Sequence, residues 1–257
     1  MPETDRYGPE LEAAVSAARA AGAEVERLRR EGVRYGSKND EELISEADIR
    51  AAEMLHEALM GAFPGDGWLS EEHVDGHERL GCDRTWVVDP IDGTREFLLG
   101  LPEFAISIAL VVEGRPVLGA VLNPANNELH AAVCDGIPER PPSKLVRPFV
   151  VLAGRAEQRW GEVPPLPREA RVHAVGSLAY RLALVAAGTG DAVVTQTPRS
   201  EWDIAAGAAL CMAAGLRVTN AHGEALRFNQ PDPKVPTLLV AEPGLHQRLR
   251  YHLRGHA

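Results

Sequence analysis

Apolar residues recur at helical spacing in two stretches of the N-terminal half, residues 9–30 and residues 45–63. Such spacing places these side chains on one face of a helix, where they can pack against a core. The aligned positions are Leu11, Val15, Val25 and Leu28 in the first stretch and Ile49, Ala52, Leu55, Leu59 and Phe63 in the second. The pattern therefore predicts two amphipathic helices.

Segments rich in β-branched residues follow, separated by short turn sequences. The predicted strands cover residues 85–89, 104–112, 116–122 and 128–133. Residues 113–115 and 123–127, between the later strands, carry Gly, Asn and Pro, which favour tight turns. Short connections of this kind join antiparallel neighbours, so we predict an antiparallel meander.

Strand-like and helix-like segments alternate in the C-terminal half, a pattern typical of a layered α/β arrangement. The predicted strands are residues 149–152, 171–175, 192–195, 216–218 and 237–240, and the predicted helices are residues 177–187, 203–214 and 245–253. Residues 136–148 hold four prolines and little hydrophobic pattern. We therefore predict an α/β protein with an N-terminal α+β subdomain, residues 1–140, and a C-terminal α/β subdomain, residues 141–257.

Composition narrows the class of partner and the compartment. The chain of 257 residues has a formal net charge of −10 and no basic run, so nucleic-acid polymers and acidic membranes are not expected partners. Its three cysteines are widely spaced and form neither a disulfide framework nor a zinc motif. The first eight residues lack a signal-peptide pattern, and the longest nearly apolar run, residues 204–216, is too short to span a bilayer. We expect a cytoplasmic protein.

Residues 85–97 carry the most chemical information, in the sequence Thr-Trp-Val-Val-Asp-Pro-Ile-Asp-Gly-Thr-Arg-Glu-Phe. Asp89 and Asp92 stand close together at the end of a predicted strand, where like charges repel and burial raises the cost. A divalent cation relieves that repulsion, and the backbone N–H groups of Gly93 and Thr94 can face an anion. The segment indicates metal-assisted phosphate chemistry. From these residues alone, an ordinary Asp-Pro and Asp-Gly turn remains the alternative.

Two further acidic positions have the same ambiguity. Glu71 and Glu72 close a turn-rich stretch, and a pair of glutamates is usually a solvated surface. Asp203 stands where an N-cap would precede an Ala-rich helix. Each position alone has a plain structural explanation.

Together, three motifs in this order resemble the signature of the lithium-sensitive, magnesium-dependent phosphomonoesterases. The motifs are Glu71-Glu72, residues 89–94 (Asp-Pro-Ile-Asp-Gly-Thr) and residues 202–207 (Trp-Asp-x-x-Ala-Gly). This superfamily includes inositol monophosphatase, fructose-1,6-bisphosphatase and the 3′(2′),5′-bisphosphate nucleotidases. The resemblance runs from about Leu11 to the C-terminus. It implies a five-layer αβαβα sandwich of the inositol monophosphatase type, with the site between the two halves.

The resemblance also implies roles for individual residues. The first Mg²⁺ would be held by Glu71, Asp89 and the backbone carbonyl of Ile91, the second by Asp89, Asp92 and Asp203, and a looser third also by Glu71. Thr94 resembles the family's water-activating hydroxyl, polarised by Asp48, and Glu71 completes the catalytic set. The N–H groups of Gly93 and Thr94 would hold the phosphate. With Ser45, Asp48 equally fits a helix capping box, and that alternative stays open.

Features outside the motifs bear on the substrate. The glycine-rich segment that follows the meander in the inositol branch is missing here. Residues 95–97 (Arg-Glu-Phe) and 226–229 (Leu-Arg-Phe-Asn) look more like the bisphosphate nucleotidase branch, the CysQ type. We therefore expect hydrolysis of the 3′-phosphate of adenosine 3′,5′-bisphosphate. The alternatives are inositol 1-phosphate, fructose 1,6-bisphosphate or histidinol phosphate as substrate. A different class, a non-catalytic phosphate-binding protein on the same scaffold, is disfavoured because no ligand position is lost.

Candidates for the leaving-group site are Gly176, Ser177, Glu201 and Arg199, and for Ser177 a helix N-cap is an equal alternative. One of Arg95, Arg199 and Arg227 could bind the second phosphate of a bisphosphate as a bidentate partner. The resemblance further implies inhibition by lithium, and a homodimer remains open because family members are often dimers.

Overall fold

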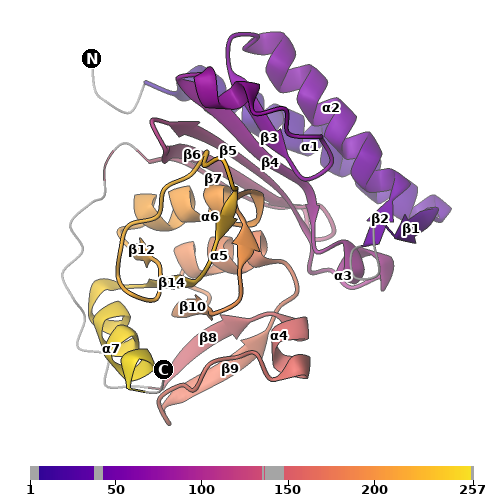
Figure 1. The fold of residues 1–257 in the computed structure, drawn as a ribbon. Coiled ribbons are helices and arrows are strands. Elements are labelled where there is room, and N and C mark those ends of the chain that lie inside the picture. Colours follow the sequence, from indigo (N-terminus) through magenta and orange to yellow (C-terminus); the bar gives the residue numbers. More distant parts are fainter. Residues whose placement is uncertain (1–5, 38–42, 135, 137–147, 256–257) are drawn as a thin grey trace.

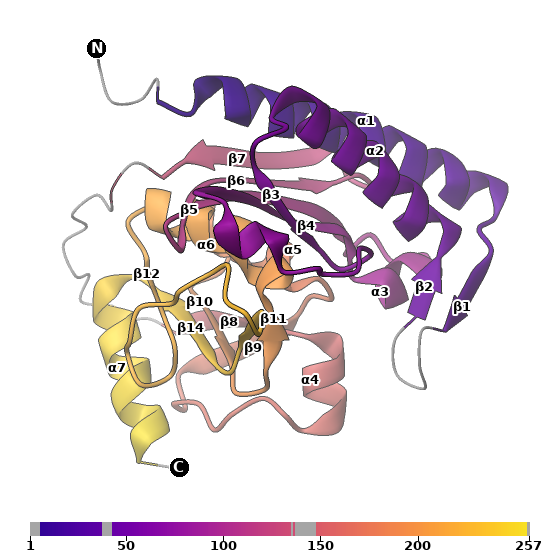
Figure 2. The same cartoon turned by 45° about the horizontal axis from the view of Figure 1, so that its top comes forward.

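Two five-stranded sheets and the helices around them form five layers (Figures 1 and 2). The computed structural model describes residues 6–37, 43–134, 136 and 148–255. Helices α1 (Gly8–Glu31) and α2 (Glu46–Ala62) cover the first sheet, α5 (Leu178–Ala186) and α6 (Glu201–Ala213) lie between the sheets, and α7 (Pro243–Arg254) covers the second sheet. Among the described residues, no helix is both long and apolar enough to cross a membrane. The predicted αβαβα sandwich is confirmed.

The first sheet contains the predicted meander with one further strand. Its order is β3 (Gly67–Ser70), β4 (Arg84–Asp92), β5 (Ala105–Val112), β6 (Arg115–Asn123) and β7 (Glu128–Val133). Strands β4 to β7 are antiparallel, whereas β3 runs parallel to β4, with Ser70 opposite Val88. The sequence did not predict β3, because its four residues adjoin the Gly- and Pro-rich stretch that reads as a turn. This strand places the next residue, Glu71, level with Asp89 of β4.

The second sheet combines parallel and antiparallel strands. Its order is β12 (Arg217–Thr219), β14 (Leu238–Ala241), β10 (Ala192–Thr195), β8 (Phe149–Ala153) and β9 (Ala170–Ala174). Strands β10, β8 and β9 are parallel, and β14 is antiparallel to both of its neighbours. All five strands lie within two residues of their predicted positions. Most of the predicted link, residues 136–148, lies outside the described residues, and the division at residue 140 stays a prediction.

Several short elements were not predicted from the sequence. They are β1 (Tyr35–Ser37), which pairs with β2 (Leu43–Ser45), the 3₁₀ helix η2 (Glu78–Gly81), α3 (Thr94–Leu98), α4 (Arg155–Trp160) and β11 (Arg199–Ser200), which pairs with β13 (Lys234–Val235). Elements this short span too few residues for hydrophobic periodicity to appear. Two of them lie within three residues of a motif aspartate: α3 begins two residues after Asp92, and β11 ends three residues before Asp203.

Close packing fixes the position of α6 against its neighbours. A Cβ atom on Gly119 of β6 would lie 2.2 Å from the Ala206 carbonyl oxygen, and one on Gly207 would lie 2.3 Å from the Leu182 Cβ atom of α5. Glycine at these positions therefore lets α6 approach both the first sheet and α5 closely. The largest of the apolar clusters forms around these two helices between the sheets. The N-terminus of α6, which carries Asp203, is held against β5, where the Ser107 hydroxyl donates to the Trp202 carbonyl oxygen.

Candidate active site

Strand β4 delivers two of the acidic side chains through an irregularity in its pairing with β5. Asp89 lies opposite Ser107 and Asp92 opposite Ala105, so three steps along β4 (92 − 89) face two along β5 (107 − 105). Pro90, between the acids, cannot donate a ladder hydrogen bond, and the extra residue forms a β-bulge. The Ile91 N–H donates to Asp89 Oδ1 at 2.9 Å. The bulge thus brings both carboxylates to one end of the strand.

Helix α6 delivers the third acidic side chain. The sequence placed Asp203 at the N-cap, which is wrong: the N-cap is Ser200, and Asp203 is the third residue of the helix. The Ser200 N–H donates to Asp203 Oδ2 at 3.2 Å. The hydroxyl of Ser107, opposite Asp89, donates to the Trp202 carbonyl oxygen at 3.0 Å and so joins the helix to β5. One carboxylate oxygen from each of Asp89, Asp92 and Asp203 lies within 4.8 Å of the others.

The electrostatics of this acidic cluster favour a bound cation. Burial, followed by the charges of Glu71, Asp92 and Asp203, raises the pKa of Asp89 well above its ordinary value. Burial and the charges of Asp92 and Glu71 do the same to the pKa of Asp203. Glu71 therefore lies near the cluster, as expected from its place after β3. Buried oxygen ligands with an excess of negative charge suit a hard divalent cation such as Mg²⁺, so the residues fit the implied metal.

The N-terminus of α5 fixes the orientation of Asp92. The Ser177 hydroxyl donates to Asp92 Oδ2 at 2.7 Å and accepts from the Tyr180 N–H at 3.0 Å. The Ala179 N–H donates to the same carboxylate oxygen. Burial raises the pKa of Asp92, and these two hydrogen bonds with the charges of Arg181 and Arg199 oppose the rise. Ser177 is thus a helix N-cap, and the same hydroxyl holds a cluster carboxylate.

Gly176, the residue before this N-cap, has a packing role. Its N–H donates to Glu103 Oε2 at 3.0 Å, and a Cβ atom there would lie 2.3 Å from Glu96 Cγ. Gly93 is similarly constrained, with a φ of +96° and only 3.1 Å between a hypothetical Cβ and the Glu103 carbonyl oxygen. Gly93 is the N-cap of α3, so the first N–H groups of that helix follow directly after Asp92.

Asp48 makes both of the contacts that the sequence had left as alternatives. Its Oδ2 atom accepts from the Ser45 N–H at 2.8 Å and from the Ser45 hydroxyl, completing the capping box of α2. Its Oδ1 atom accepts from the Thr94 hydroxyl at 2.9 Å. The Thr94 hydroxyl also lies 3.1 Å from the Ile91 carbonyl oxygen. One carboxylate therefore serves the helix cap and the motif threonine together.

Arg199 and Glu201 have partners within the protein. Arg199 Nη2 donates to Glu157 Oε1 at 2.7 Å, and Glu157 also binds Arg181 at 2.8 Å. Burial opposes ionisation of Glu157, but the two arginines outweigh it and lower its pKa to about 2. The Glu201 carboxylate accepts from the backbone N–H groups of Asn229 and Gln230, so it is directed to that loop.

Two residues of this network were missed from the sequence. Arg181 stands within an apolar helix, and an arginine in such a helix is a usable signal for a buried ion pair. Glu157, in contrast, lies on a short helix with no distinguishing pattern. The charge of Arg181 acts on Asp92, as does that of Arg199, and Glu157 is linked to the site because it binds both arginines.

Comparison with known proteins agrees with this geometry. A profile described as the inositol monophosphatase family matches residues 8–256. The chain belongs to the inositol monophosphatase family. Among its relatives, a 3′-phosphoadenosine 5′-phosphate phosphatase of Mycobacterium leprae (strain TN) is 33% identical over 254 residues, 91% of this chain and 90% of that protein. The 3′(2′),5′-bisphosphate nucleotidase CysQ of Salmonella typhimurium is 33% identical over 205 residues, 76% of this chain and 82% of that protein.

Solved structures of the family share the fold. The extragenic suppressor protein suhB of Bartonella henselae superposes with a TM-score of 0.79 at 26% identity, covering 97% of this chain and all (100%) of that one. CysQ from Bacteroides thetaiotaomicron gives a TM-score of 0.73 at 27% identity, covering 92% and 98%. The family predicted from the three motifs is confirmed, and the names of these relatives agree with the predicted class of phosphate-ester hydrolase.

Replacing Asp89 by Asn should separate charge from shape at the centre of the cluster. In the metal-free protein the repulsion falls, so the Tm should hold or rise, by roughly 2–4 °C per kcal/mol relieved for a chain of this size. Phosphatase activity with Mg²⁺ should fall by at least ~10³-fold if both metals depend on Asp89. Calorimetry of chelator-treated protein and a phosphate-release assay measure the two effects. Retention of more than about a tenth of the activity would contradict a bridging role.

The pH dependence of stability provides the control. A carboxyl group whose folded-state pKa is raised stabilises the fold below its unfolded-state pKa and loses that contribution as pH rises through the folded-state value. The metal-free wild type should therefore lose stability from acidic toward neutral pH because of Asp89 and Asp203. The Asn variant should show a shallower loss, and the same slope in both proteins would show that Asp89 does not titrate as described.

Thr94→Ala and Asp48→Asn should behave as one unit. A hydroxyl that activates water needs its acceptor, so the kcat/KM of the double variant should be no lower than that of the poorer single variant. Ser45→Ala is the matched control, because it removes the cap and leaves the contact between Asp48 and Thr94. It should cost about 1 kcal/mol of stability with little change in activity. If the losses of kcat/KM from the first two substitutions were strictly additive, Asp48 would only cap α2.

Proposed function

We propose that this protein is a Mg²⁺-dependent phosphomonoesterase that removes the 3′-phosphate of adenosine 3′,5′-bisphosphate. The observation that carries the proposal is the carboxylate cluster of buried Asp89 with half-buried Asp92 and Asp203, whose repulsion a bound cation would relieve. Relatives that are 33% identical bear the names 3′(2′),5′-bisphosphate nucleotidase and 3′-phosphoadenosine 5′-phosphate phosphatase. These names support the nucleotidase branch over the inositol branch.

The residues assigned to the metals are those implied by the motifs. Glu71, Asp89 and the Ile91 carbonyl would hold one Mg²⁺, Asp89, Asp92 and Asp203 a second, and Glu71 would contribute to a third. Bound Mg²⁺ supplies charge neutralisation for the phosphate oxygens and lowers the pKa of water. The hydrogen bonds from Ser177 and Ala179 hold the Asp92 carboxylate in one orientation. Preset ligands of this kind need little rearrangement when the cation binds.

Thr94 is the proposed water-orienting group. Its single hydroxyl proton has two acceptors, Asp48 Oδ1 at 2.9 Å and the Ile91 carbonyl oxygen at 3.1 Å. When the Ile91 carbonyl is used as a ligand, Asp48 is the remaining acceptor. The Thr94 oxygen can then accept a hydrogen bond from the attacking water. This bond turns the proton of the water away from phosphorus and leaves an oxygen lone pair facing it. The N–H groups of Gly93 and Thr94, at the start of α3, are proposed donors to the phosphate.

The positions of three arginines discriminate among the candidates for the second phosphate. Arg227 donates to the Glu113 carbonyl oxygen. Glu113 follows the C-terminal end of β5, whereas Asp92 pairs with Ala105 at the other end of that strand. Arg199 acts through its charge on both Asp92 and Asp203, so it lies beside the cluster. Arg95, on α3, follows Thr94 directly and is exposed. We infer that Arg199, held by Glu157, binds the 5′-phosphate of the substrate.

The remaining features of the proposal follow from the sequence. A net charge of −10 disfavours a nucleic-acid polymer or an anionic membrane as partner. It is compatible with a small anionic substrate that binds through metal cations. We further propose a cytoplasmic enzyme, two subdomains divided near residue 140, inhibition by Li⁺ in place of Mg²⁺, and a homodimer. Gly176 and Ser177 support the site through packing and through Asp92, and Glu201 supports it through the loop at Asn229.

Phosphate release from a substrate panel tests the function. With Mg²⁺, adenosine 3′,5′-bisphosphate should give a higher kcat/KM than inositol 1-phosphate, fructose 1,6-bisphosphate, histidinol phosphate or AMP. A preference of about tenfold or more for inositol 1-phosphate would overturn the nucleotidase assignment and leave the metal chemistry intact. No release from any ester by metal-loaded protein would favour the non-catalytic alternative.

Arg199→Gln, assayed on the same panel, tests how the second phosphate is bound. Loss of a charged hydrogen bond costs about 1.5–3 kcal/mol, so kcat/KM for adenosine 3′,5′-bisphosphate should fall roughly 10- to 100-fold. The value for adenosine 3′-monophosphate, which lacks the 5′-phosphate, should change far less. Arg227→Gln is the comparison and should leave both values unchanged. An equal loss on both nucleotides would show that Arg199 acts on the site as a whole.

A further inference from the structure

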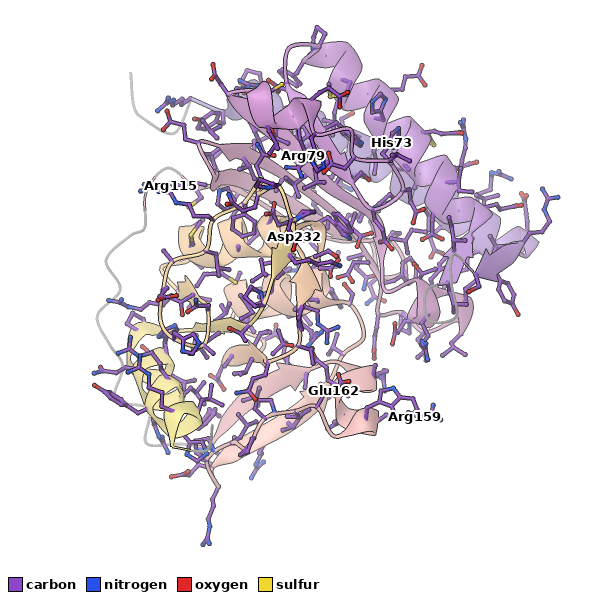
Figure 3. The ribbon with its side chains drawn as sticks, in the orientation of Figure 1. His73, Arg79, Arg115, Arg159, Glu162 and Asp232 are labelled. Atoms are coloured by element: carbon purple, nitrogen blue, oxygen red, sulfur yellow. The ribbon has the colours of Figure 1, made fainter. Side chains whose placement is uncertain are left out.

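Arg79 is a buried arginine that joins two loops distant in the sequence. Its side chain is 1% exposed. The guanidinium donates to both carboxylate oxygens of Asp75, with the shortest contact at 2.6 Å. It also donates to Asn229 Oδ1 at 2.6 Å and to the Gln230 carbonyl oxygen at 2.9 Å. Figure 3 labels Arg79 on the N-terminal side of this junction and Asp232, further along the other loop, on the C-terminal side.

The loop that receives Arg79 is in turn held by the first residue of α6. The fully buried Glu201 carboxylate accepts from the Asn229 N–H at 2.6 Å and from the Gln230 N–H at 3.0 Å. The Glu201 N–H donates to the Pro233 carbonyl oxygen at 2.9 Å. Asn229 has a φ of +58°, a left-handed conformation that asparagine tolerates better than most residues. The loop is therefore fixed on both sides, by Arg79 and by Glu201.

These contacts connect the segment that carries Glu71 with the helix that carries Asp203. At one end, Asp75 and Arg79 close the loop that begins with Glu71 after β3. At the other end, Glu201 lies two residues before Asp203 on α6. Ser70 pairs with Val88 in the parallel β3–β4 ladder, so Glu71 follows level with Asp89, and Asp89 lies in the same cluster as Asp203. Without a connection of this kind, a loop and a helix from different halves of the chain would bring their carboxylates together independently.

We propose that Arg79, with Asn229 and Glu201, is a positioning clamp that holds Glu71 and Asp203 in register for metal binding; this rests on the proposed metal-dependent function. The clamp assigns Asn229, the last residue of the Leu-Arg-Phe-Asn segment, to assembly of the metal site. Asn229 is not assigned to direct recognition of the nucleotide. Residues that orient metal ligands from outside typically change metal affinity by 10- to 100-fold when they are altered.

Mn²⁺ binding to chelator-treated protein, followed by electron paramagnetic resonance, tests the clamp without any substrate. Arg79→Lys keeps the charge and loses the planar fork that reaches acceptors on three residues, Asp75, Asn229 and Gln230. Asn229→Gly keeps the left-handed backbone and loses the side-chain acceptor. Each variant should weaken Mn²⁺ binding by about tenfold, and the double variant should lose less than the product of the single effects. Arg115→Gln, an exposed arginine at the start of β6, is the matched control and should bind Mn²⁺ normally (Figure 3).

Two further measurements make the outcome decisive. At Mg²⁺ concentrations below saturation, kcat/KM should fall by the same factor for adenosine 3′,5′-bisphosphate and inositol 1-phosphate, because weaker metal binding does not depend on the leaving group. A loss confined to the nucleotide would assign the Asn229 segment to substrate binding and overturn the clamp. A lower melting temperature with unchanged Mn²⁺ affinity would also overturn it, and Asn229→Gly decides the matter if Arg79→Lys does not fold.

Failure of the clamp and failure of the proposed function give different results. Wild-type protein that binds Mn²⁺ but hydrolyses no phosphate ester would defeat the function and leave the clamp to be judged by affinity. Wild-type protein that is active, with variants that bind Mn²⁺ normally, would defeat the clamp alone. Wild-type protein that binds no Mn²⁺ would defeat both.

Discussion

The mutual repulsion of carboxylates held at one buried point is the constraint on which this structure depends. Asp89 is 1% exposed. One of its carboxylate oxygens nevertheless lies within 4.8 Å of a carboxylate oxygen of Asp92 and of one of Asp203. Two unit charges 4 Å apart repel by about 4 kcal/mol at an effective dielectric constant of 20. A fold that keeps such groups together without a cation must compensate with many other contacts. The raised pKa values of Asp89 and Asp203 express the same cost, which a bound cation would remove.

The surrounding fold holds each carboxylate through backbone features that also stabilise helices and strands. A β-bulge at Pro90 sets Asp89 and Asp92, and the N-terminus of α5 fixes the second of these. The cap of α2 positions Asp48 toward Thr94. Asp203 accepts from the N-cap residue of its own helix. Helix N-termini favour negative charge, so the same interactions that begin the helices reduce the cost of assembling the acidic groups.

The sequence predicted the chemistry of the site better than the means by which the site is held. Asp89 and Asp92 alone could form an ordinary turn, and they were assigned to a metal site because the other two acidic motifs follow the order of a family signature. The long helices and the meander were predicted because their apolar positions repeat many times. β3 was not, since its four residues carry no period, and Asp203 was misplaced by three positions because Ser200 was not recognised as the cap. Glu201 was expected near the substrate, but its role depends on a loop that lies 28 residues later. Long-range contacts such as those of Arg79 leave no local pattern in a sequence.

The most direct test of the central claim is a crystal structure of the protein grown with Mn²⁺, with anomalous scattering used to locate the metal. The account predicts anomalous peaks in contact with Asp89, with one shared by Asp92 and Asp203 and another reaching Glu71 and the Ile91 carbonyl. A map with no peak at these carboxylates, or with Mn²⁺ bound only elsewhere, would contradict it.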